Sequence, residues 1–307
     1  MDVIPVVEVL KNCFAISNCM IKVDHRGNGI NYWINDAYFL KVFTDSVKYR
    51  IEDEIAVCAF LRSRGFPTSE FLPTVEGRYI QKTGAYRCHM QKRISGVAHE
   101  GNSLCFDECI LLIKRLKQII ELLSDCPVET NLNMLFAGEF VKADIMNAIL
   151  KRSCDAESDL LPILRRKSDL LDRVRFQTGK IQHAVLSHSD YHVQQILTTE
   201  LQIKSLEDIK VIDFSHVSKV PIEWEIIRAC LRSMEFDREA SVAAIVRSLE
   251  IFERVVPMCC ENLCIAVIQL ISSSYTERMY RSTHQQAWLE RTIFELDVLE
   301  KVYECVR

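Results

Sequence analysis

Several features that would place this 307-residue chain in a special class are missing from its sequence. No apolar run approaches the ~18 residues of a membrane span. The first sixteen residues lack a basic stretch followed by an apolar core, which would mark a secretory leader. The net charge of -4 gives no basic field, so binding to DNA or RNA is not indicated. We therefore expect a cytoplasmic globular protein with neither a membrane nor a nucleic acid as partner.

Clustered cysteines are also absent, although the chain has 13 of them. They are odd in number and scattered, unlike the regular spacing of a secreted disulfide framework or a zinc ribbon. The pairs Cys105/Cys109 and Cys260/Cys264 lie four apart on expected helices without paired histidines. Free thiols buried in a reducing compartment are the favoured interpretation. With 49% apolar and 26% charged residues, the chain has the balance of one large or two ordinary globular domains.

The stretch richest in chemistry runs from 187 to 197 and is followed by a second one at 211–214. Asp190 and Asp213 each come at the end of an apolar, strand-like run. The residues 195–199 and 201–203 read as short strands that meet near Glu200, which would bring both acids close to the amide of Gln195. Two buried strands with acidic loop ends are the simpler alternative. Phosphoryl transfer from a nucleotide needs such a set, because one carboxylate orients a hydroxyl and other oxygens bind magnesium.

These two stretches resemble the catalytic loop and the metal-binding strand of the aminoglycoside phosphotransferase and choline kinase-like family. That family reads H-G-D-x-H-x-x-N-[IV]-L, followed about twenty residues later by [VI]-I-D-[FW]. Ser189 replaces the usual glycine and Gln195 the usual asparagine. The matching residues are His188, Asp190, His192, Ile196, Leu197, Ile212, Asp213 and Phe214.

The resemblance implies an α+β, bilobal protein kinase-like fold with a small antiparallel-sheet lobe and a larger, mainly helical lobe. The expected boundaries are 1–93 for the nucleotide-binding lobe and 94–307 for the helical lobe with the catalytic loop and acceptor pocket. Asp190 is then the catalytic residue that orients the acceptor hydroxyl and takes its proton. Asp213 is the expected Mg²⁺ ligand, with Gln195 as the second, and magnesium demands near-octahedral geometry that a longer side chain must satisfy.

The amino-terminal third supplies the expected nucleotide contacts. Lys41 interrupts an apolar strand, where burying it without a partner is costly. The resemblance has this lysine reach the nucleotide phosphates, held by Glu54 of the next helix; a lysine that only extends to solvent from an edge strand is the alternative. Gly27 and Gly29 suit a tight hairpin turn, which the resemblance makes a flap over the phosphates.

The run Met90–Gly96 resembles the family's linker between lobes, whose backbone faces the adenine edge. Gln91 and Arg93 are accordingly expected to contact the nucleotide. Beyond the linker, apolar periodicity predicts helices. Their expected ranges are 106–123, 135–151, 159–176, 238–252, 257–280 and 284–306.

In this family the carboxy-terminal helices build the acceptor pocket. From His216 onward 14 acidic residues face 11 basic ones, an excess too small to identify a cationic acceptor. Four aromatic residues there could stack on a sugar or surround an ammonium group, but core packing is favoured for each. They are Trp224, Tyr275, Tyr280 and Trp288.

The resemblance thus implies a kinase that moves the γ-phosphate of ATP or GTP, with Mg²⁺, to a hydroxyl of a small molecule. Aminoglycosides, amino sugars and amino alcohols are the acceptors it suggests, so an amine-bearing acceptor is one expectation. A nucleotide-binding pseudokinase or regulatory protein of the same fold is the alternative, because Gln195 departs from the family pattern.

Overall fold

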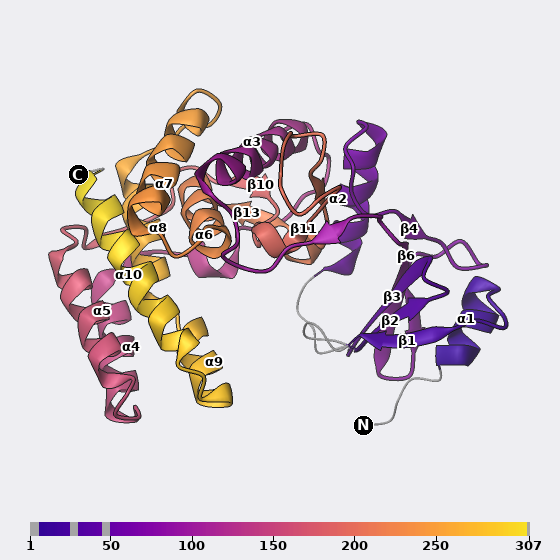
Figure 1. The fold of residues 1–307 in the computed structure, drawn as a ribbon, viewed down its shortest axis with the longest axis horizontal. Coiled ribbons are helices and arrows are strands. Elements are labelled where there is room, and N and C mark those ends of the chain that lie inside the picture. Colours follow the sequence, from indigo (N-terminus) through magenta and orange to yellow (C-terminus); the bar gives the residue numbers. More distant parts are fainter. Residues whose placement is uncertain (1–5, 25–29, 45–49, 306–307) are drawn as a thin grey trace.

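The computed structural model describes residues 6–24, 30–44 and 50–305. Figure 1 shows a small lobe built on a sheet at one end of the molecule and a larger helical lobe at the other. The described strands of the small lobe pair antiparallel. The expected α+β, bilobal architecture is therefore confirmed.

The small lobe contains one helix and a sheet whose path runs β1-β2-β3-β6-β4, with β5 also paired to β6. The helix α1 and this sheet enclose a core of their own, which includes Leu10 of the helix and Leu40 of the central strand. The elements are α1 (Val6–Phe14), β1 (Ile21–Asp24), β2 (Ile30–Ile34), β3 (Tyr38–Thr44), β4 (Phe71–Leu72), β5 (Gln81–Thr83) and β6 (Tyr86–Lys92).

The two faces of this sheet serve different purposes. Side chains alternate along a strand, so Leu40 and Val42 of β3 point into the core against α1. Lys41 points to the opposite face, where it lies directly across from His89 of β6 in the strand register. The alternation thus places a lysine and a histidine on the face of the sheet that is turned away from α1.

The helix α2 (Ile51–Ser63) lies between the sheet and the helical lobe. Its residues Val57, Cys58 and Leu61 belong to the large hydrophobic core of the helical lobe, not to the core of the sheet. After the helix, Thr68 forms a bridge to Val211, next to the second motif. The division at 93/94 remains a prediction from sequence, while the packing ties α2 to the helical lobe.

The helical lobe follows the expected order with three differences. The range 257–280 is two helices, because the serine-rich stretch 272–274 separates them and serines favour caps over helix interiors. The range 135–151 becomes a helix only from Lys142. Residues 201–203 form no strand, so that expectation was wrong.

The small sheet beside the motif pairs β11 (Ile196–Thr198) with β12 (Lys210–Val211) and β7 (Val97–Ala98). No helix among the described residues is both long and apolar enough to cross a membrane. The helices of this lobe are α3 (Phe106–Leu123), α4 (Lys142–Cys154), α5 (Leu161–Arg173), α6 (Ile222–Ser233), α7 (Arg238–Glu253), α8 (Cys260–Ser272), α9 (Tyr275–Thr283) and α10 (Ala287–Cys305). Its remaining short elements are η1 (Met134–Phe136), β8 (Phe140–Val141), β9 (Thr178–Gly179), β10 (Val185–Ser187), η2 (Val193–Gln195), η3 (Phe214–His216) and β13 (Ser218–Val220).

All 13 cysteines lie in the part of the chain that the structure describes, and all are free thiols. The sulfurs of buried Cys109 on α3 and Cys230 on α6 are 3.7 Å apart. Four of the thiols are buried and four are exposed, so the expected burial holds for only part of the set.

Candidate active site

The loop that carries Asp190 is anchored by buried side chains on both sides. His188 is fully buried, and its Nε2 lies 2.8 Å from the carbonyl oxygen of Ile212, the residue before Asp213. The hydroxyl of Tyr191 donates to the carbonyl of Leu112 on α3 at 2.9 Å. His188 therefore joins the two motifs directly.

Asp213 stands at the end of β12 in a left-handed backbone conformation, with φ +60° and ψ +60°. Its carboxylate accepts a hydrogen bond from Nζ of Lys41 at 2.6 Å, across the gap between the lobes. Burial acts to raise the pKa of Asp213, but the charge and hydrogen bond of Lys41 outweigh it and bring the pKa to about 2. Asp213 is therefore ionised at neutral pH, as a metal ligand must be.

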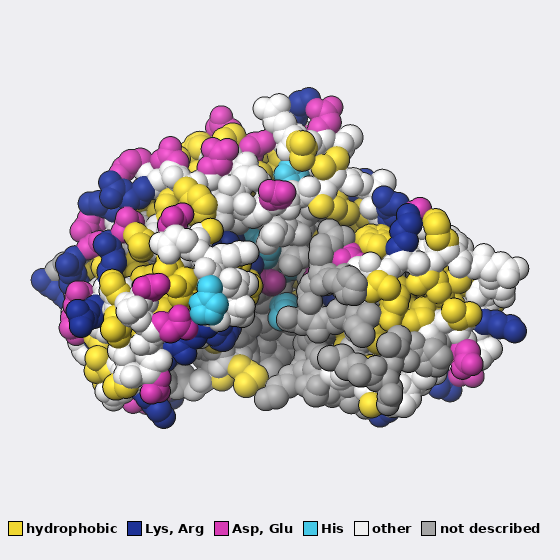
Figure 2. Space-filling model, turned by 60° about the horizontal axis from the view of Figure 1, so that its bottom comes forward, with side chains coloured by type: hydrophobic (Ala, Val, Ile, Leu, Met, Phe, Trp, Pro, Cys, Tyr) yellow, Lys and Arg dark blue, Asp and Glu magenta, His cyan; other side chains and the backbone are white. Residues whose placement is uncertain are grey.

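The face between the lobes is hollowed, and Figure 2 shows acidic and histidine side chains at the base of the hollow. The side chains of Lys41 and Asp213 keep 17% and 35% of their surface exposed, so this pair is accessible from solvent. Lys41 therefore does not merely extend to solvent from an edge strand, since β3 is central in the sheet and its lysine reaches the second motif.

Glu54, expected to hold Lys41, takes a different position. Its side chain is fully buried on α2, and neither carboxylate oxygen has a hydrogen-bond partner among the described residues. Nε2 of His89 is 3.9 Å from the nearer oxygen. Burial raises the pKa of Glu54 to about 7, although the charge of Lys41 acts to lower it. The expected hydrogen bond between Lys41 and Glu54 is absent among the described residues, and Lys41 donates to Asp213 instead.

Asp190 is held by two arginines that sequence reasoning did not single out. Oδ1 accepts hydrogen bonds from Arg228 and, at 3.0 Å, from Arg232. Burial acts to raise the pKa of Asp190, but the charges of the two arginines outweigh it and hold this pKa well below its usual range. The sequence signal was present, because the two arginines lie four apart on the helix after the second motif and so share one face.

Gln195 lies between the two acids. Its backbone oxygen accepts from the amide of Ile212 at 2.9 Å, and its side-chain nitrogen is 3.5 Å from Oδ2 of Asp190. Among the described residues no group of three or more His, Cys, Asp or Glu side chains could hold a metal by itself. Magnesium is usually bound through one or two protein oxygens together with substrate phosphates. The carboxylate of Asp213 and the amide of Gln195 fit that pattern.

Ser189 occupies the position where the family has glycine, and its backbone explains the glycine. Its φ is +62°, a left-handed conformation that glycine adopts without steric cost. The serine hydroxyl accepts from the hydroxyl of Ser218 at 2.8 Å and donates to that residue's carbonyl oxygen at 3.2 Å. These bonds join the loop of Asp190 to β13 and offset part of the strain.

The linker after β6 lies against the helical lobe. A side chain at Gly96 would come within 2.8 Å of Cβ of Leu197, so only glycine permits this approach. Gln91 is buried in β6, and Arg93 is exposed, with its guanidinium over the ring of Trp33. Their expected nucleotide contacts stay predictions. Gly27 and Gly29 lie outside the described residues, so the expected phosphate flap stays a prediction too.

Comparisons with known proteins rest on structure alone, because no family model and no curated protein matches the sequence. A spectinomycin phosphotransferase solved with ADP and spectinomycin is 14% identical, with a TM-score of 0.63 and 97% of each chain covered. An amicoumacin kinase solved with AMP-PNP and Ca²⁺ is 11% identical, with a TM-score of 0.65 over 98% of this chain and 94% of that one. A microcompartment-associated aminopropanol kinase is 16% identical, with a TM-score of 0.59, 98% of this chain and 97% of that chain being covered. These likenesses cover nearly the whole chain and show that it has the bilobal kinase-like fold.

Proposed function

We propose that this chain, which has the kinase-like fold of small-molecule phosphotransferases, transfers the γ-phosphate of ATP or GTP to a hydroxyl group of a small molecule. The observation that carries the proposal is the contact of Lys41 with Asp213 across the two lobes, beside a loop that presents Asp190. Neighbours of the same fold were solved with ADP, GDP or AMP-PNP. The amino-bearing antibiotics and the amino alcohol of those neighbours are one candidate class of acceptor.

In the proposed reaction, the protein positions two substrates and does little covalent chemistry. Lys41 would contact nucleotide phosphates and Asp213 would hold Mg²⁺ with Gln195, where the ion neutralises phosphate charge. Asp190 would accept a hydrogen bond from the acceptor hydroxyl and take its proton as the new O–P bond forms. Lys41 and Asp213 come from different lobes, so the nucleotide would be bound between them.

A nucleotide-binding pseudokinase is the second candidate, and one observation favours it. Oδ1 of Asp190 already accepts hydrogen bonds from two arginines, and its lowered pKa makes it a weak proton acceptor. Together with Gln195 in place of asparagine, this arrangement fits a protein that binds a nucleotide without turnover. The two candidates therefore differ in whether phosphate transfer follows binding.

The deciding experiment measures phosphate transfer from ATP and GTP to a panel of hydroxylated amines, acids and sugars, with Mg²⁺ present. Transfer that disappears in Asp190→Ala supports the kinase. Nucleotide-dependent thermal stabilisation that is lost in Asp213→Asn, without transfer to any compound, supports the pseudokinase. The absence of both would overturn the nucleotide site itself.

A further inference from the structure

One face of α6 carries three residues spaced by four, Trp224, Arg228 and Arg232, and this spacing places them in a row along the helix. The row runs beside Asp190, to which both arginines donate hydrogen bonds. Arg228 also stacks over Trp224, with its guanidinium carbon 5.2 Å from the ring centre. This face of α6 is therefore cationic where it meets the proposed catalytic carboxylate.

Aromatic rings of α9 and α10 extend this cationic face. The guanidinium of Arg232 lies 5.7 Å from the ring centre of Tyr275, which packs edge-on against Trp288 at 5.9 Å. A third arginine, Arg291, lies 5.9 Å from the ring centre of Trp288. Trp224 and Tyr280, the other two aromatic residues considered from sequence, are each only 5% exposed. The rings next to Asp190 are thus occupied by arginines and do not form a cage for an ammonium group.

The two arginines share a single close carboxylate, and one of their donors has no partner among the described residues. Asp190 gives one negative charge to Arg228 and Arg232 together, and Arg291 has its own partner in Glu295, at 2.9 Å. Nη1 of Arg228 is buried without a hydrogen-bond partner among the described residues. Burial and the charge of Arg228 lower the pKa of Arg232 to about 10, which leaves it charged at neutral pH. Glu225, buried on the same helix, also interacts with the charge of Arg228, but burial raises the pKa of Glu225 to about 7. Arg228 and Arg232 therefore share one close carboxylate, and the buried Nη1 of Arg228 remains without a partner among the described residues.

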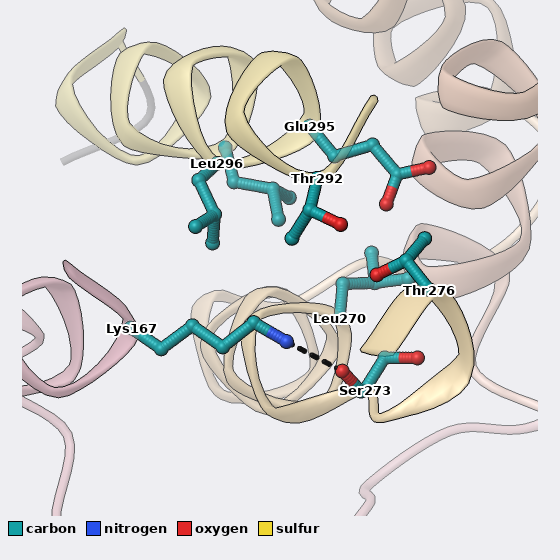
Figure 3. A pocket seen from close by; sticks show the side chains of 8 residues that line it. Lys167, Leu270, Ser273, Thr276, Thr292, Glu295 and Leu296 are labelled. Atoms are coloured by element: carbon teal, nitrogen blue, oxygen red, sulfur yellow. Dashed lines mark hydrogen bonds between the residues drawn. The ribbon is translucent and has the colours of Figure 1, made fainter. Parts of the chain in front are cut away.

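The small cavity behind this cluster cannot supply the missing partner. Figure 3 shows it enclosed between α5, α8, α9 and α10, with Glu295 and Thr292 on one side and Lys167 on the other. Its volume is about 10 Å³, room for about one water molecule. Nζ of Lys167 is already bound by Glu277 and the carbonyl oxygen of Ser273. A ligand for the arginines must therefore come from the solvent side, where Asp190 lies.

We propose that the acceptor carries an anionic group, a carboxylate or a phosphate, that binds Arg228 and Arg232 beside the hydroxyl to be phosphorylated. This inference rests on the proposed function, because it names the substrate class of the same site. Guanidinium groups match carboxylate and phosphate oxygens in pairs of parallel hydrogen bonds. An ammonium group placed there would meet two like charges.

The same geometry links anion binding to the ability of the Asp190 carboxylate to accept the proton of the hydroxyl. An anion on the arginines draws hydrogen bonds away from Oδ1, so the carboxylate becomes free to accept the hydroxyl proton. The acceptor oxygen then forms its bond to the γ-phosphorus as the bond to the nucleotide's β-phosphate oxygen breaks, and the proton remains on Asp190. An acceptor without the anionic group leaves both arginines on the carboxylate.

Matched acceptors test the proposal. One set is glycerate, glyceramide and 3-amino-1,2-propanediol, and a second is gluconate, glucose and glucosamine. Transfer from MgATP is measured with the wild type, with Arg232→Gln and with Arg247→Gln. Arg247 is a suitable control because its side chain is 59% exposed and pairs with Glu250 on the same helix, α7.

We expect transfer to the acids, with KM for the acid raised about tenfold or more in Arg232→Gln, since hydrogen bonds between charged groups are being removed. KM for the nucleotide and the behaviour of Arg247→Gln stay at wild-type values. Arg228→Gln repeats the measurement should Arg232→Gln fail to fold. Transfer to the amines or neutral compounds in preference to the acids would overturn the proposal.

A failure of the kinase proposal gives a different pattern. If no compound receives phosphate, calorimetric titration of glycerate and gluconate into the wild type and Arg232→Gln decides the anion site separately. Binding that is weakened about tenfold by the substitution supports an anion site on a protein without transfer activity. Equal binding to both proteins, or none to either, overturns it.

Discussion

Replacing Glu54 with glutamine should change how the stability of the protein depends on pH. The carboxyl group of Glu54 is fully buried and its oxygens lack hydrogen-bond partners among the described residues. Burial raises its pKa from 4.5 to about 7. That rise of about 2.5 in pKa corresponds to about 3 kcal/mol of free energy, at 1.36 kcal/mol for each unit. Glu54→Gln keeps the shape of the side chain and removes the ionisation.

The direction in which the free energy of unfolding changes with pH follows from which state, folded or unfolded, holds the proton of Glu54. Between pH 4.5 and about 7 the unfolded chain has released the proton of Glu54 while the folded protein retains it. The stability that Glu54 contributes is therefore present below pH 4.5 and is lost as pH rises through 7. The wild type should lose up to about 3 kcal/mol relative to Glu54→Gln across this window. Buried histidines such as His89, whose pKa burial lowers, titrate in both proteins, so the difference isolates Glu54.

The assay is urea unfolding followed by circular dichroism at half-unit intervals from pH 4 to 8, for the wild type and Glu54→Gln. Glu52→Gln is the matched control, because Glu52 lies on the same helix with its side chain exposed. We expect a difference that changes with pH for Glu54→Gln alone. A difference for Glu54→Gln that is constant over the range, or that changes in the opposite direction, would refute the argument from burial.

Three further predictions concern the two motifs. Ser189→Gly should be more stable than Ser189→Ala by about 0.5–1 kcal/mol in thermal unfolding. Both variants lose the hydroxyl, but only alanine keeps the left-handed strain of roughly 1–2 kcal/mol, from which the conformational entropy cost of glycine, roughly 0.5–1 kcal/mol, is subtracted. Equal stabilities would mean that φ at this position is not strained. Gln195→Asn should retain or raise phosphate transfer, and a large loss would argue against Gln195 as a metal ligand. Asp213→Asn should abolish the Mg²⁺-dependent part of nucleotide stabilisation in a thermal shift assay, whereas an unchanged shift would remove Asp213 from the metal site.

The sequence predicted the parts of the site that depend on local pattern. An apolar run that ends in an acid identified the loop of Asp190 and the strand before Asp213. The alternation of β3 places Lys41 on the face toward the helical lobe, so its meeting with Asp213 follows from strand periodicity once the fold is known. Helix α3 was expected at 106–123 and found there, because its apolar spacing is regular.

The features that the sequence did not predict depend on competition between partners. Lys41 acts electrostatically on two carboxylates, Glu54 and Asp213, and hydrogen-bonds only to Asp213 among these two, a choice that sequence spacing cannot reveal. The arginines of α6 were visible as a pair four apart, but a cationic helix face is usually solvated, so contact with Asp190 required the fold. The break between α8 and α9 has a local signal in its serines, which apolar periodicity alone overlooked.

The proposed catalytic carboxylate and the proposed metal-binding carboxylate are both paired with cations in this structure, and the two pairs have the same consequence. Lys41 forms an ion pair with Asp213, and Arg228 and Arg232 form ion pairs with Asp190. Each carboxylate is therefore ionised but already bound to a cationic side chain. Under the proposed function, a Mg²⁺-nucleotide would bring both a cation for Asp213 and phosphates for Lys41, and an anionic acceptor would bring the matching partner for the arginines. Each ligand would thus replace the ion pair that it breaks, whereas a neutral or cationic acceptor would leave Arg228 and Arg232 bound to Asp190 and its carboxylate engaged. Selection of the acceptor by charge therefore follows from the same arrangement that keeps Asp190 ionised.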